Sequence, residues 1–213
     1  MHKKFLTKVA VLILPTLLFL SSTTHAYLAI GESGEVVPLG NFQFNAQPQF
    51  FTNEGSSANI LVSVDTPWTS SASSRFTVGG GKMNPTLGAS IKWIPFPDVD
   101  RQPAIGGKAQ VWYARYENGN ILTFQLAPLI SRKMDTDVGL FIPYFAVPFN
   151  FTNTKDRNYA NQQFVLGTEW KVPDYPQMTL GGEVALNLKD SFSFFLFTFS
   201  YQIDASNGLQ LKR

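Results

Sequence analysis

Four charged side chains stand out in segments that otherwise alternate between apolar and polar residues. Lys92 and Lys108 lie on two consecutive segments, and Glu169 and Glu183 lie on another consecutive pair. If each segment is a strand, these charges share a face with Asn, Gln, Ser and Thr residues. A buried charge needs a partner. We therefore expect either an ion-pair network that braces a narrow interior or a polar constriction that selects small solutes.

The residue types that most often act as nucleophiles or general bases, histidine and cysteine, are scarce in this chain. Both histidines, His2 and His25, lie within the first 26 residues, and the chain has no cysteine. A catalytic site built on histidine or cysteine is therefore excluded from the rest of the chain. Carboxylate or lysine chemistry stays open, but no constellation points to it. We expect no catalytic residue, no enzyme activity and no cofactor.

Two segments contain an Asp-x-Asp pattern, at 96–103 and 132–139. Carboxylate oxygens suit Ca²⁺, and strands that alternate in direction would bring both segments to the same rim. Adjacent cations can neutralise these carboxylates instead, and the candidates are Arg101, Arg132 and Lys133. We favour this second interpretation and expect no metal site.

The elements that would position these residues are strands. Regular short segments with a period of two, separated by turn-forming residues, predict an all-β sandwich or barrel. We predict ten strands at 41–50, 59–65, 75–82, 86–94, 104–116, 121–131, 138–152, 161–171, 178–189 and 191–203. The segment 138–152 is apolar on both faces and contains Pro143 and Pro148, so we expect a bulge there.

The two faces of these strands differ in kind. The apolar faces carry no charge, and the opposite faces are mostly Asn, Gln, Ser, Thr and Gly. Charged residues on those polar faces are few: Asp65, Lys92, Lys108, Glu169 and Glu183. A soluble carrier barrel needs a charged exterior, whereas a barrel with apolar outside and polar inside is typical of a membrane. We therefore expect the polar face to line the lumen, where Trp112 could narrow the passage.

The first 26 residues have the layout of a cleaved secretory signal peptide. Lys3, Lys4 and Lys8 precede an apolar run at 9–20, and a small residue, Ala26, ends the segment. Twelve apolar residues are too few for a spanning helix, which needs roughly 20. Removing the three lysines from the 17 basic residues leaves 14 against 15 acidic ones. That balance gives no electrostatic case for nucleic-acid binding.

The final strand carries alternating aromatic residues, Phe195, Phe197, Phe199 and Tyr201. With the signal peptide and the alternating strands, this makes the chain resemble a small bacterial outer-membrane β-barrel protein. The resemblance covers residues 39–203 and implies that these four aromatics face lipid. It also implies that the barrel-assembly machinery reads them during biogenesis. One departure is that residues 204–213 follow the aromatic strand instead of the chain ending there.

These observations predict a signal peptide at 1–26, an N-terminal extension at 27–38, a transmembrane barrel at 39–203 and a C-terminal tail at 204–213. The barrel is all-β and antiparallel, with about ten strands and eight as the alternative. Ten strands leave at most a narrow passage. We expect a structural or porin-like narrow-pore protein of the outer membrane, with membrane lipid as its partner. The alternatives are a surface adhesion or recognition barrel and a soluble carrier barrel.

Overall fold

The computed structural model describes residues 28–52, 57–100, 102–116, 119–155, 158–189 and 193–206. The predicted signal peptide, both histidines, Arg101 and the last seven residues of the predicted tail lie outside these ranges. Within them, no helix is long and apolar enough to cross a membrane.

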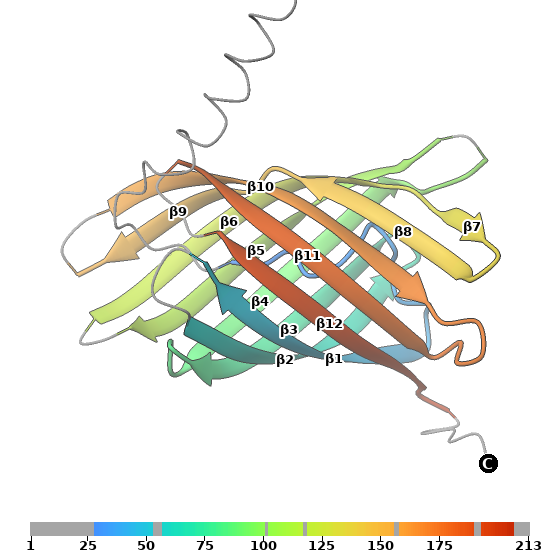
Figure 1. Ribbon diagram of the computed structural model, residues 1–213, viewed down its shortest axis with the longest axis horizontal. Helices are drawn as coiled ribbons and strands as arrows, with labels where there is room; N and C mark the ends of the chain where they lie inside the picture. The colour runs from blue at the N-terminus through green and yellow to red at the C-terminus, as the bar shows by residue number, and fades with distance from the viewer. Residues whose placement is uncertain are drawn as a thin grey trace, which may run out of the picture.

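In the described ranges, twelve strands form one sheet (Figure 1). Their bounds are β1 (Asn41–Phe51), β2 (Ser57–Thr69), β3 (Ala72–Gly81), β4 (Thr86–Phe96), β5 (Ala104–Tyr116), β6 (Gly119–Ser131), β7 (Met134–Thr136), β8 (Gly139–Ala146), β9 (Phe149–Thr154), β10 (Asn158–Lys171), β11 (Met178–Lys189) and β12 (Phe194–Asp204).

The sheet closes on itself into an antiparallel barrel. Strand β1 pairs with both β2 and β12, and β10 pairs with β11. Strands β8 and β9 both lie between β6 and β10, so together they occupy one position around the barrel. Strand β7 pairs with the first residues of β8, and the two form a short hairpin at the end of the barrel wall. The predicted ten-stranded antiparallel barrel is therefore confirmed.

The gap between β8 and β9 falls at Pro148, which has no N–H to donate to the ladder. Against β10, Ala146 pairs with Val165 and Phe149 pairs with Gln162, so three residues face three. The same spacing holds against β6. The expected bulge at this place is wrong, because the register runs through the proline unchanged.

Polarity is inverted relative to a soluble domain. Exposed side chains on the outer face are mostly large and apolar, whereas the buried side chains of the strands include many amides, hydroxyls and charges beside apolar residues at the barrel ends. On β12, Phe195, Phe197 and Phe199 are 45%, 51% and 55% exposed, while Thr198 is buried. Tyr201 lies on the same outer face and is partly exposed. This alternation follows from the two-residue period of a strand.

The lumen is occupied by residues 28–38, which run through the barrel without regular secondary structure. Leu28 contacts Leu61 and Trp112 near the end where β2 begins and β5 finishes. Pro38 lies at the other end, where its carbonyl accepts a hydrogen bond from the first residue of β1, Asn41. We call residues 28–38 the luminal segment. Part of its blue trace is visible between the strands (Figure 1).

Candidate functional site in the barrel lumen

Glu32 of the luminal segment meets three cations of the barrel wall. Its carboxylate lies 2.6 Å from Lys92 Nζ, 2.7 Å from Lys108 Nζ and 3.5 Å from Arg75 Nη2. All four side chains are almost fully buried, with 2–6% of their surface exposed. Ion pairs this deep keep their strength because water cannot screen them.

The same cations also bind backbone carbonyls of the luminal segment. Lys92 donates to the carbonyls of Ser33 and Glu35, and Lys108 donates to that of Ile30. Amide side chains extend this row of donors, since Gln110 donates to Ala29 and Gln47 to Gly31. Strands β1, β4 and β5 therefore present donors to the carbonyls of the segment.

The acidic wall on β10 and β11 binds the N–H groups of the same segment. The two oxygens of Glu183 accept from Ile30 N at 3.1 Å and Gly31 N at 2.6 Å. The two oxygens of Glu169 accept from Ser33 N at 2.8 Å and Ser33 Oγ at 2.7 Å. Carboxylates bound to N–H donors in this way form strong, short hydrogen bonds.

Lys92, Lys108, Glu169 and Glu183 thus all point toward one luminal segment. They do not pair with each other as the ion-pair network would require. The lysines share Glu32, and the glutamates bind the backbone. Tyr144, which pattern reasoning did not single out, donates its hydroxyl to Glu183 at 2.8 Å.

Arg75 is the third wall cation and is held by a carboxylate of its own. Its guanidinium donates two bonds to Asp65, at 2.5 Å and 2.7 Å. This is the bidentate geometry that arginine forms with carboxylates. It also donates to the carbonyl of Gly31. Arg75 therefore links the β2–β3 wall to the luminal segment, and the sequence analysis did not identify it.

Two glycines allow the luminal segment to lie this close to the wall. Gly31 has a φ of +62°, a left-handed conformation that side-chain-bearing residues rarely adopt. A Cβ on Gly34 would lie 2.6 Å from Ser131 Oγ and 3.1 Å from the Cβ of Ala104. A side chain at Gly34 therefore needs a change in the neighbouring Ser131 side chain.

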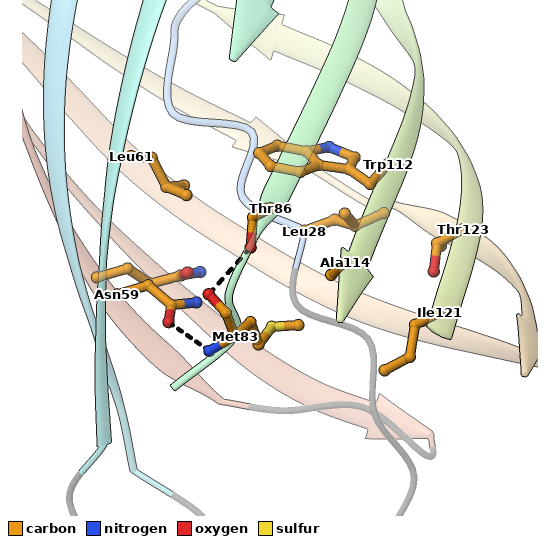
Figure 2. A pocket seen from close by; sticks show the side chains of 10 residues that line it. Leu28, Asn59, Leu61, Met83, Thr86, Trp112, Ala114, Ile121 and Thr123 are labelled. Carbon is orange, nitrogen blue, oxygen red and sulfur yellow. Dashed lines mark hydrogen bonds between the residues drawn. The ribbon is translucent and has the colours of Figure 1, made fainter. Parts of the chain in front are cut away.

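The segment is anchored at its start by apolar contacts (Figure 2). Leu28 packs with Leu61 of β2 and lies beside Trp112 of β5. Beside it is a cavity of about 10 Å³, barely the size of one water molecule. Met83 closes it from below, with its N–H donating to Asn59 Oδ1 at 3.1 Å. Trp112, predicted to narrow the lumen, does so by packing on the luminal segment.

At the mouth where the segment ends, the contacts are looser. Glu35 pairs with Lys133 at 2.9 Å and Lys171 at 3.5 Å, and both lysines are 39% exposed. The two Asp-x-Asp segments do meet here, because Lys133 N donates to the carboxylate of Asp98 at 2.5 Å. Among the described residues, no cluster of carboxylates or imidazoles has an arrangement that would hold a metal ion.

Comparison with known proteins identifies no family and no curated relative. Solved structures with some likeness include a bacterial polysaccharide outer-membrane secretin, with 9% identity and a TM-score of 0.45. The match covers 76% of this chain and 65% of that one. The β-domain of the Bordetella autotransporter BrkA matches over 76% and 97%, with 8% identity and the same score.

The translocator domain of the autotransporter NalP from Neisseria meningitidis matches with 10% identity and a TM-score of 0.45. That match covers 78% of this chain and 88% of the translocator. Similarity at this level transfers no residue role, so the assignment of the lumen rests on its own geometry.

Proposed function

We propose that the protein is an integral β-barrel of the bacterial outer membrane whose lumen is closed by its own luminal segment. In the closed state it is a structural barrel. Withdrawal of residues 28–38 would open a narrow polar passage for small solutes. The observation that carries the proposal is the placement of Glu32 between Lys92, Lys108 and Arg75, deep inside the lumen.

The exterior supports a membrane location. Exposed Phe, Leu, Ile, Val and Trp side chains cover the outward face of most strands. Hydrocarbon offers no partner to a free strand edge, and closure between β1 and β12 leaves none in the barrel wall. Outer-membrane lipid is accordingly the proposed partner of the exterior, and the aromatic face of β12 is the proposed signal for the barrel-assembly machinery.

The ion pairs of the lumen favour a segment that plugs the barrel over a set of ion pairs that only stabilises the wall. A brace would pair the wall lysines with the wall glutamates directly. Here the wall groups bind a segment that reaches β1 only through Pro38, Leu39 and Gly40, all of which are exposed. The charged groups of the described lumen are engaged in this binding, and the proposal assigns them no catalytic role.

The test is the conductance of Glu32→Lys in a planar lipid bilayer. A fourth cation beside Lys92, Lys108 and Arg75 repels the segment while leaving every strand residue unchanged. We expect the wild type to remain closed and the variant to conduct. Glu35→Lys is the matched control, because its side chain sits at the mouth, and it should stay closed. A folded Glu32→Lys barrel that remains silent would contradict the proposal.

A further inference from the structure

The wall of the lumen forms hydrogen bonds mainly with backbone groups of the luminal segment and less with its side chains. Five carbonyls of the segment accept bonds from the wall, those of Ala29, Ile30, Gly31, Ser33 and Glu35. Four N–H groups donate to it, those of Ile30, Gly31, Ser33 and Gly34. Main-chain hydrogen bonds with a few specific side-chain contacts are how proteins bind extended peptides.

We infer that the lumen is a peptide-binding site, occupied in cis by residues 28–38 and able to bind the same sequence in trans once that segment is displaced. The inference rests on the proposed function, since it requires the segment to be displaceable. It adds the class of ligand: a short peptide without regular secondary structure that has one buried glutamate between small residues.

The geometry defines which peptide fits. Glu32 is the side chain that satisfies the two lysines, so a ligand needs a carboxylate at that position. Gly31 and Gly34 are required by close approach to the wall. Ser33 donates its hydroxyl to Glu169. The apolar residues Leu28, Ala29 and Ile30 are buried and precede this motif, so the ligand reads as an apolar stretch followed by Gly-Glu-Ser-Gly.

The connection to the barrel permits a direct test. Leu39 is 62% exposed, and a Cβ on Gly40 would contact nothing within 4 Å. A protease recognition sequence inserted between these two residues can be cut after the full chain has folded in detergent with its segment in place. The cut segment is then exchanged against a fluorescein-labelled synthetic peptide, LAIGESGEVVP, and binding is followed by anisotropy.

We expect the cut segment to stay bound through gel filtration or to be replaced by the labelled peptide. A peptide with glutamine at the Glu32 position should bind roughly a hundredfold more weakly, because it leaves two buried lysines without their carboxylate. Glutamine at the Glu35 position should weaken binding by about fivefold or less, as for a partly exposed pair. Loss of the segment without rebinding, or equal binding of all three peptides, would overturn the inference.

A second variant avoids the insertion. In full-length Glu32→Lys the segment is repelled from the lumen, so the labelled wild-type peptide should bind to this variant and not to the wild type. Absence of binding to a folded Glu32→Lys barrel that conducts would overturn the inference.

Conductance of the same samples separates this inference from the proposed function. An emptied barrel that conducts and is not closed by peptide refutes the peptide site and leaves the plug. An emptied barrel that binds peptide but never conducts refutes the pore and leaves the binding site.

Discussion

Glu32 Oε1 lies 2.7 Å from Lys108 Nζ, and the two side chains are 6% and 2% exposed. One belongs to the luminal segment and the other to the middle of β5. Lys108 lies directly opposite Lys92 in the β4–β5 ladder. Like charges in that position repel each other, so β4 and β5 carry two adjacent positive charges that a group from outside the sheet neutralises. Glu32 is that group.

Removing the carboxylate of Glu32 should destabilise the folded barrel strongly. In Glu32→Gln, two lysines stay buried without their anion, and breaking a buried pair in this way costs about 3–5 kcal/mol. The measurement is urea unfolding in detergent, followed by tryptophan fluorescence.

Glu35→Gln is the matched control for that experiment. Its two lysine partners are each 39% exposed, and pairs of this kind contribute about 1 kcal/mol or less. Equal losses of stability in the two variants would show that the burial of Glu32 has no energetic consequence.

A charge-deletion series tests which groups neutralise the lysines. Lys92→Met with Lys108→Met should destabilise the protein by a few kcal/mol, because the buried Glu32 loses its two nearest cations and keeps only Arg75, at 3.5 Å. Adding Glu32→Gln should recover part of that loss, which chemical denaturation would measure. Adding Glu169→Gln and Glu183→Gln instead should lower stability further, since those glutamates hold N–H groups of the segment. Recovery by the second pair would favour direct pairing across the wall.

The barrel could be predicted from sequence because most strands repeat the same alternation of apolar and polar residues. Phe197 and Thr198 illustrate it, since adjacent residues of a strand point to opposite faces and one is apolar while the other is polar. No other arrangement satisfies so many alternating segments with so few charges. The two faces of 138–152 could not be told apart, because both are apolar. Pro143 and Phe145 point outward, while Ile142 and Tyr144 point inward.

The luminal segment could not be predicted, because residues 27–38 are short and show no period. The conformation of residues 28–38 is imposed by the wall and not by local preference. A signal was nevertheless present in two lysines on neighbouring strands with no acid between them. Knowing the register would have shown that each wall glutamate lies opposite a glycine, Glu169 opposite Gly181 and Glu183 opposite Gly167. The two glutamates therefore have no charged partner across the β10–β11 ladder. The wall lysines and the wall glutamates both need partners from outside the sheet.

The free-energy cost of a charge on the outward face of β12 should depend on its depth in the membrane. Phe199 lies at the centre of the strand, and Ile203 lies on the same face one residue from its end. Phe199→Arg should cost about 2–4 kcal/mol, while Ile203→Arg, nearer the membrane interface, should cost about 1 kcal/mol or less. Folding into lipid vesicles at graded urea concentrations gives both values. A larger cost at Ile203 would mean that the membrane does not surround this face as proposed.

The position of the luminal segment itself can be locked covalently. A Cβ on Gly34 would lie 2.6 Å from Ser131 Oγ, so the two Cβ atoms would be at most about 4 Å apart, within the range that a disulfide spans. The chain has no natural cysteine, so any disulfide within one molecule of Gly34→Cys/Ser131→Cys joins the segment to β6. We expect this bond to form on mild oxidation and to shift the mobility of the unfolded chain on a non-reducing gel. Each single variant has no second thiol and should not shift.

The oxidised double variant carrying Glu32→Lys should also conduct less than its reduced form, because the disulfide holds the segment in the lumen against the added charge. A double variant that stays reduced while folded would place residue 34 away from β6 and contradict the plugged lumen.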